Sequence, residues 1–430
     1  MTVNVSDLER VLNRLFDKRF EKLFAYNMPH VGLFPKGTKF GGNDQRHSAM
    51  DASTPGGGAD FATALANMGP PQYGAFVMTR KRDYSLFQIM TEAILASAES
   101  EYGVVQALEN VVMAAMHTFK DSISTALFGN GGGSRGRVGS TNAMALTLAD
   151  PRDHVKFYRG MLIRSCSTDG TSAVGDNDVA TITAIDRRNG ILYRSDANWT
   201  AGGHYSDGDH LFRSADLLTT GGDGTGYNLM LAGLNGWIPE TAPVVGGGDS
   251  WYSFDRSVDP VKYAGVRAEA DANHDGTLGN AILRLLKEVG DEGGDPDTVL
   301  CHTDVKLQLI KEVGDQTMHV KAVGSDGKPS TTIGYDVLKF IGPNGPVKVV
   351  STVYCPRSTV WGLTMNTWKL DTLGECPRFL PNVGGVTKYL TAYNADAVQG
   401  RLGYYGNLKC YAPGHNGRMD VTDVLQPEAA

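Results

Sequence analysis

The clearest hydrophobic pattern in the chain is helical and runs from Val104 to Leu127. Apolar residues recur there at spacings of three and four, which places them on one face of an α-helix. The run Gly129-Asn130-Gly131-Gly132-Gly133 follows and cannot continue a helix. About 24 residues at about 1.5 Å each predict a rod of roughly 36 Å. A rod of that length needs a sheet or a neighbour along it.

Two further patterns precede this helix. Apolar residues from Leu8 to Leu23 recur at helical spacing behind the cap candidate Ser6, which predicts an amphipathic helix. From Val31 to Pro71 the chain is irregular and rich in glycine and proline, apart from a short helical stretch at Phe61 to Met68. This segment is typical of an arm that lies on another surface.

The segment Gln72 to Ile94 has the composition of extended strands and predicts a hairpin, which alone would be only marginally stable. In its middle lies the charged tract Arg80, Lys81, Arg82 and Asp83. One interpretation makes the tract a solvated strand end, which composition favours. The other makes these four residues candidates for ion pairs between subunits, each weak but repeated many times.

Short β segments follow the long helix between Pro151 and Asp216, with Asn189-Gly190 as a turn signal. About 65 residues with such regular turns predict a small β-barrel inserted into the main fold. The predicted segments are Gly160 to Ile163, Ala180 to Ile185, Ile191 to Tyr193, and His210 to Phe212.

After a glycine-rich connector at residues 221–226, strands and helices alternate irregularly, which favours an α+β fold class over a doubly wound sheet. Long strands rich in tyrosine, and interrupted by Gly400, Gly403 and Gly406, are expected near the end. The predicted helices are Asn280 to Val289 and Asp304 to Val313, and the predicted strands are Thr298 to Cys301, Val347 to Tyr354, Ser358 to Leu363, and Lys388 to Tyr411.

Composition narrows the function classes. A chain of 430 residues with 41% hydrophobic residues can form two or three packed units. Its formal charge of −7 argues against a surface that wraps nucleic acid. The five cysteines form no C-x-x-C pair, which favours reduced, structural thiols. With no long apolar run and no secretory signal, we expect neither export nor membrane spanning.

Two motifs with possible chemistry fit poorly. Ser134 lies in a G-x-S-x-G match, but such a nucleophile sits between a strand and a helix, whereas this motif follows a helix. The run from Asp271 to Gly276 resembles the start of a calcium-binding loop, yet Ile282 replaces the bidentate glutamate. We therefore expect no catalytic residue, no metal and no cofactor, and a polar turn that caps the helix from Asn280.

The order of these segments resembles the major capsid proteins of tailed bacteriophages with the Hong Kong ninety-seven type fold. The resemblance is carried by FATALANMGPPQYGAFVMTRKRDYSLFQIMTEAILAS, SISTALFGNGGGSRGRVGS and LTAYNADAVQGRLGYYGNLKCYAPG. It implies an N-terminal arm at residues 1–55, an extended loop at 56–100, a spine helix and first part of a peripheral domain at 101–150, an inserted β-barrel at 151–217, a connector at 218–231, an axial domain at 232–370, and the second part of the peripheral domain at 371–430.

The resemblance also implies a function without catalysis. Such a chain would assemble with itself into pentamers and hexamers, which build the icosahedral head shell around double-stranded DNA. A separate scaffolding protein, a portal and a decoration protein would be partners, and assembly would take place in the bacterial cytoplasm. The alternatives are an encapsulin-like compartment protein and a hydrolase that uses Ser134.

Overall fold

The computed structural model describes residues 29–42, 44–90, 101–170, 179–194, 198–200, 204–214, 216, 228–316, 339–342, 345–374, 377–380, 389–391 and 396–425. The helix predicted between Leu8 and Leu23 and the connector at residues 221–226 lie outside these ranges. None of the helices in the described ranges is long and apolar enough to cross a membrane.

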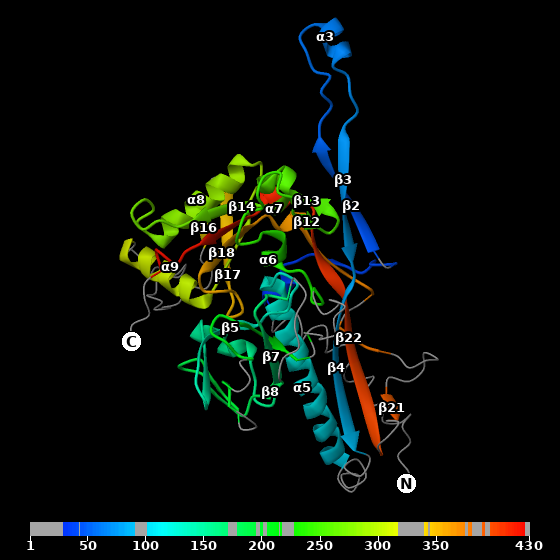
Figure 1. Cartoon of the computed structure of the whole chain (residues 1–430), viewed down its shortest axis with the longest axis vertical. Helices are drawn as coiled ribbons and strands as arrows, with labels where there is room; N and C mark the ends of the chain where they lie inside the picture. Colours follow the sequence, from blue (N-terminus) through cyan, green and yellow to red (C-terminus); the bar gives the residue numbers. More distant parts are fainter. Residues whose placement is uncertain are drawn as a thin grey trace, which may run out of the picture.

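A two-stranded hairpin projects far from the body of the molecule (Figure 1). Strand β2 (Asp44–Ala52) pairs antiparallel with β3 (Gln72–Thr79), and helix α3 (Phe61–Ala66) lies at the tip, where a short helix was predicted. The prediction that Gln72 to Ile94 forms its own hairpin is wrong. Its first half pairs with β2, whose sequence DQRHSAMDA carries no obvious strand signal, and its second half pairs with a strand near the C-terminus.

The longest strand, β22 (Ala397–Cys410), organises a six-stranded sheet. Strand β4 (Lys81–Met90) runs antiparallel to it, from Lys81 opposite Gly406 to Met90 opposite Ala397. In Figure 1 these two strands form one long ribbon below the hairpin. The remaining strands are β1 (Lys36–Gly37), β19 (Trp368–Thr372), β20 (Arg378–Phe379) and β21 (Tyr389–Thr391).

The glycines of β22 make room for large side chains. A Cβ atom at Gly400 would lie 2.1 Å from the ring of Phe87, and one at Gly403 would lie 2.8 Å from Leu380. The sequence suggested that these glycines interrupt the strand. That interpretation is wrong, because β22 continues through both and uses them for close approach.

Helix α5 (Glu101–Phe128) confirms the long helix and extends the prediction at its N-terminal end. Its described part buries one face against the sheet of β22, with the ring of Phe119 6.2 Å from that of Tyr404. The hydroxyl of Ser85 on β4 donates to the carbonyl of Ala115 at 3.3 Å. The long helix therefore packs along a sheet, as its length led us to expect.

A seven-stranded sheet closes on itself beside the end of α5. Only Ile182 and Thr183 separate the edge strands β8 (Ala180–Thr181) and β9 (Ala184–Asp186). The N–H of Ile182 donates to the carbonyl of Met161, and the N–H of Thr183 donates to the carbonyl of Tyr193. The two edges are therefore continuous, and the sheet forms a small barrel around its own core. The barrel begins earlier than predicted, since it includes two strands before residue 151. Its strands are β5 (Gly136–Thr141), β6 (Ala145–Leu148), β7 (Leu162–Cys166), β8 (Ala180–Thr181), β9 (Ala184–Asp186), β10 (Ile191–Tyr193) and β11 (His210–Arg213).

The α+β unit has a mixed six-stranded sheet with a separate hydrophobic core. Helix α8 (Leu278–Asp291) buries its apolar stripe on this sheet, and α9 (Thr303–Gln316) packs beside it. Both helices confirm the predictions within a few residues. Strand β23 (Gly417–Asp420) also belongs to this sheet, although the sequence analysis placed residues 371–430 with β22 in the peripheral domain. The sheet order is β14 (Val266–Glu269), β23 (Gly417–Asp420), β18 (Thr359–Leu363), β15 (Thr298–Cys301), β17 (Gly345–Ser351) and β16 (Lys339–Gly342).

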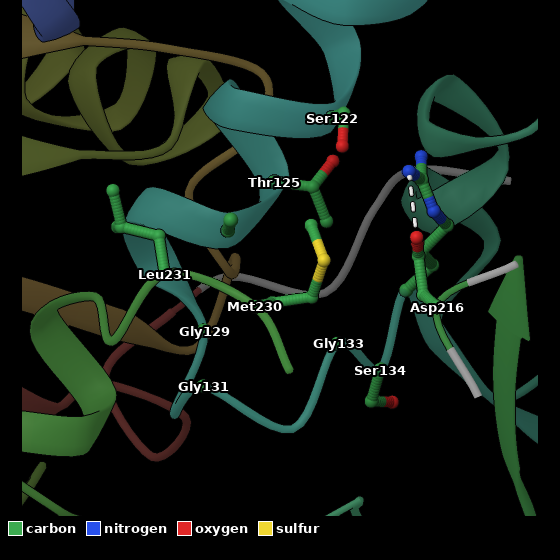
Figure 2. Close-up of a pocket in the computed structure, with 11 residues that line it drawn as sticks. Ser122, Thr125, Gly129, Gly131, Gly133, Ser134, Asp216, Met230 and Leu231 are labelled. Carbon is green, nitrogen blue, oxygen red and sulfur yellow. Dashed lines mark ion pairs between the residues drawn. The ribbon is translucent and has the colours of Figure 1, made fainter. Parts of the chain in front are cut away.

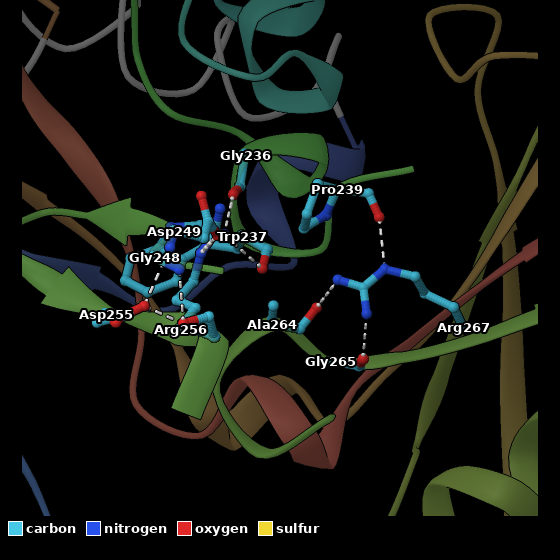
Figure 3. A network of polar contacts seen from close by, with 11 residues as sticks. Gly236, Trp237, Pro239, Gly248, Asp249, Asp255, Arg256, Ala264, Gly265 and Arg267 are labelled. Atoms are coloured by element: carbon cyan, nitrogen blue, oxygen red, sulfur yellow. Dashed lines mark hydrogen bonds and ion pairs between the residues drawn. The ribbon is translucent and has the colours of Figure 1, made fainter. Parts of the chain in front are cut away.

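The buried Arg256 and the half-buried Arg267 hold the chain where it enters this unit (Figure 3). Arg256 donates to the carbonyl of Gly236 at 2.9 Å and to the Asp249 carboxylate at 2.8 Å. Arg267 donates to the carbonyl of Pro239 at 2.7 Å. Short elements complete the description: α2 (Pro29–Gly32), α6 (Leu234–Trp237), α7 (Pro260–Ala264), β12 (Ser250–Trp251), β13 (Phe254–Asp255), and the 3-10 turns Pro151–Lys156, Arg256–Val258, Met365–Thr367 and Pro413–His415.

The cysteines in the described ranges are buried and free, as the sequence led us to expect. They are Cys166, Cys301, Cys355 and Cys410; Cys376 lies outside these ranges. Burial raises the pKa of Cys301 and of Cys410 to about 12. These thiols are therefore protonated at neutral pH and contribute to packing.

Candidate interaction surfaces

The hairpin tip exposes a cluster of large apolar side chains. Asp60 caps α3, since its carboxylate accepts from the backbone N–H of Thr63 at 3.1 Å. The side chains of Phe61 and Met68 are 80% and 74% exposed, and Leu65 is also exposed. Single exposed apolar residues are ordinary, but a cluster on a projection far from the body (Figure 1) indicates a contact with another molecule.

The base of the hairpin is held firmly in the body. Phe76 and Met78 on β3 are buried, and the ring of Phe76 lies 4.7 Å from that of Phe254 and 5.4 Å from that of Trp237. A two-stranded hairpin has little stability of its own. This anchor therefore fixes the direction in which the tip projects.

The predicted contact tract Arg80 to Asp83 divides between two sides of the molecule. Successive side chains of a strand point to opposite faces. Lys81 and Asp83 point inward, where Lys81 donates to the carbonyl of Asn228 and Asp83 forms an ion pair of 2.9 Å with Arg213. Arg80 and Arg82 line a groove on the open face of the sheet. The side chains of Lys81 and Asp83 thus have partners inside their own chain, and Arg80 donates to backbone carbonyls beside the groove.

The Asp83 ion pair belongs to a buried charge network that joins the barrel to the rest of the molecule. Asp216 lies 2.5 Å from Arg213 and 3.5 Å from Arg135. Burial lowers the pKa of Arg213, but the carboxylates of Asp216 and Asp83 outweigh it, so the net pKa lies above its ordinary value. Arg213 is therefore charged at every physiological pH, and the network works as a structural joint.

The Ser134 motif has a geometry unlike that of a nucleophile elbow. Ser134 lies between α5 and β5, so a helix leads into the loop and a strand leads out, as the sequence indicated. Its hydroxyl lies 3.0 Å from Nδ1 of His210, a partner that sequence reasoning did not find. Ser134 is one of the residues that line a cavity of only about 10 Å³ (Figure 2). That space holds about one water molecule and no substrate.

The run Asp271 to Gly276, which resembles the start of a calcium-binding loop, forms a polar turn. The Asp275 carboxylate is buried and pairs with Arg284 at 2.8 Å, and it also accepts from the N–H of Asp271. The helix that follows begins at Leu278, two residues before the predicted start at Asn280, and Thr277 caps it. Within the described ranges no group of three or more His, Cys, Asp or Glu side chains has the arrangement of a metal site.

Comparison with known proteins gives one match to a family model and several long structural overlaps. Residues 216–400 match the SU10 major capsid protein. A search of curated proteins finds no match.

Among solved structures, the capsid asymmetric unit of cyanophage A-1(L) is 11% identical, with 92% of this chain and 93% of that chain covered and a TM-score of 0.49. The capsid of the native GTA particle is 10% identical, with 91% and 89% covered and a TM-score of 0.42. The SrpI encapsulin complex from Synechococcus elongatus is 8% identical, with 93% and 89% covered and a TM-score of 0.42.

The identities and TM-scores of these overlaps are low, so the likeness to capsid proteins rests on the family match. Along the chain, the projecting hairpin is followed by the long helix on its sheet, the small barrel and the α+β unit. Residues 216–400, somewhat less than half of the chain, are thus similar to the SU10 major capsid protein family.

Proposed function

We propose that the chain assembles into pentamers and hexamers that close an icosahedral head shell around double-stranded DNA. The match to a capsid family supports a shell-forming role. Rings of five and six copies require contacts between different patches of neighbouring subunits, and a projecting arm supplies such a contact without a large core. The shell protein then works by binding copies of itself and needs no catalytic group.

Each unit of the chain has a place in this proposal. The hairpin β2–β3 acts as the extended loop, which moves that loop toward the N-terminus from the expected residues 56–100. Helix α5 and the sheet of β22 form the peripheral domain, and the α+β unit forms the axial domain at ring centres. The barrel is an insertion whose buried joint to Asp83 gives it a fixed position.

The observation that carries the proposal is the exposed apolar tip of the hairpin. Helix α3 lies far from the body of the molecule (Figure 1), and Phe61, Leu65 and Met68 of this tip are exposed and belong to none of the three cores. Each large apolar side chain contributes about 1.5–3 kcal/mol when it is fully buried. Burial against a neighbouring copy at every position of a shell would make the tip a principal source of assembly energy.

Replacement of Phe61, Leu65 and Met68 by serine tests this role. We expect the variant to fold, because these exposed side chains belong to none of the hydrophobic cores of the described ranges, and to form at least tenfold fewer shells by electron microscopy and light scattering. The matched control is Val244→Ser with Val245→Ser, two equally exposed apolar residues on the body. Shells in normal yield from the tip variant would remove the tip from the assembly mechanism.

The proposal includes partners and a place of assembly. A separate scaffolding protein, a portal and a decoration protein would act with the shell in the bacterial cytoplasm. Particles purified from infected cells distinguish this function from an encapsulin-like compartment. Packaged DNA supports the phage head, whereas a protein cargo without DNA supports the compartment.

A further inference from the structure

A groove of about 480 Å³ lies on the sheet face opposite helix α5. Four of its eight lining residues are arginines, and none is acidic. The lining consists of Arg80, Arg82, Tyr84, Leu373, Arg378, Leu380, Arg401 and Tyr405. The sequence had pointed to Arg80 and Arg82 as contact candidates, but it did not find Arg378 and Arg401, which come from two other parts of the chain.

Strand register explains why these side chains meet. Arg82 lies opposite Tyr405 in the pairing of β4 with β22, and Tyr84 lies opposite Gly403. Arg378 on β20 also lies opposite Gly403, from the other side of β22. Because alternate residues share a face, Arg401 and Tyr405 point with Arg82 to the open side. The neighbouring residues Leu402 and Tyr404 are buried toward α5.

The groove carries a strong positive charge, and no acidic residue belongs to the lining that the structure describes. In the part of the chain that the structure describes, Arg82, Arg378 and Arg401 have no ion pair with a carboxylate. Arg80 is held in place by donating to the carbonyl of Gly42 at 3.0 Å. Cations gathered in a concave site focus the positive potential and attract anions. Guanidinium groups bind carboxylates through paired hydrogen bonds.

We propose that this groove binds carboxylate side chains of a neighbouring copy of the same chain. The inference rests on the shell-forming function proposed above. Acidic residues outnumber basic ones in the chain by 47 to 40, so the surface of another copy supplies the complementary charge. The groove is flanked by Tyr84 and Leu86, which are 44% and 59% exposed. Apolar neighbours of this kind suit a protein surface better than the phosphate backbone of DNA.

Carbodiimide cross-linking tests the proposal directly. In the variant Arg82→Lys with Arg401→Lys the groove keeps its charge and gains amines that a carbodiimide joins to adjacent carboxylates. We expect assembled shells to give intersubunit peptides that link position 82 or 401 to an acidic residue, and the unassembled chain to give none. Assembled shells without such a link would overturn the proposal.

Charge reversal provides the second measurement. We expect Arg82→Glu with Arg401→Glu to raise the protein concentration needed for shell assembly at least tenfold, while Arg187→Glu with Arg188→Glu, in an exposed turn of the barrel, changes it little. Thermal unfolding of the unassembled variants checks that they fold. If the charge-reversed chain does not fold, the neutral variant Arg82→Gln with Arg401→Gln takes its place in the assembly measurement.

The outcomes separate this inference from the proposed function. If the wild-type chain forms no shells, the proposed function fails. If wild-type and reversed chains form shells equally well, only the groove proposal fails. Normal assembly of the reversed chain together with weaker binding of a DNA oligonucleotide would assign the groove to phosphate and would also overturn it.

Discussion

At the scale of single residues, His30 shows how burial makes this chain sensitive to acid. Its ring lies 6.0 Å from that of Phe128 and 5.8 Å from that of Tyr354, and its Nε2 atom has no hydrogen-bond partner in the described ranges. Burial, helped by the charge of Lys120, lowers the pKa of His30 to about 4. The folded chain therefore keeps this imidazole neutral.

The pKa of His30 predicts a loss of stability in mild acid. The unfolded imidazole takes up a proton near pH 6.5, and the folded one does so only near pH 4. Between these values the unfolded state binds more protons, so the free energy of unfolding falls as the pH drops, by roughly 3 kcal/mol in all. The urea midpoint of the unassembled chain, measured from pH 7 to pH 4, checks this slope.

The variant His30→Leu isolates the contribution of this residue. Its urea midpoint is expected to fall less between pH 7 and pH 4 than that of the wild type. The control His274→Leu, at an exposed position, should keep the full slope. Equal slopes for all three proteins would place the acid sensitivity elsewhere.

At the scale of elements, the contact between β4 and β22 depends on glycine as much as on apolar residues. The ring of Phe87 occupies the space that a side chain at Gly400 would fill. Ten residues of β22 pair with β4, so a local shift at this point would affect the sheet that supports α5.

Gly400→Ala is expected to destabilise the chain by about 1–3 kcal/mol, because the added methyl overpacks a filled site. Phe87→Leu in the same chain should recover part of this loss by vacating the space. Unfolding measurements on the two single variants and the double variant give the coupling. The control Gly57→Ala should have little effect, since nothing lies within 4 Å of a Cβ atom there. Strictly additive losses would contradict the contact.

Elements with strong local patterns could be predicted from the sequence, and their partners could not. Helices α5 and α8 have apolar stripes that burial requires, so their periodicity located them within a few residues. The partner of β3 was missed because Asp44–Ala52 carries few strand-forming residues and gains its structure from pairing. The contact of Ser134 with His210 and the meeting of the groove arginines depend on register between distant segments, which one sequence does not encode locally.

At the scale of the whole molecule, three separate hydrophobic cores divide the chain into a sheet with its long helix, an α+β unit and a barrel. The hairpin belongs to the first core only at its base, where Phe76 is buried. Its tip lies outside all three, so the apolar side chains of the tip stay exposed in the single chain.

Electron cryomicroscopy of assembled particles is the most direct test of the hairpin's role. We expect closed shells built from rings of five and six copies, in which the β2–β3 hairpin of each copy lies across its neighbour and Phe61, Leu65 and Met68 are buried there. A chain that stays monomeric under all conditions, or shells in which the hairpin tip contacts only solvent, would contradict it.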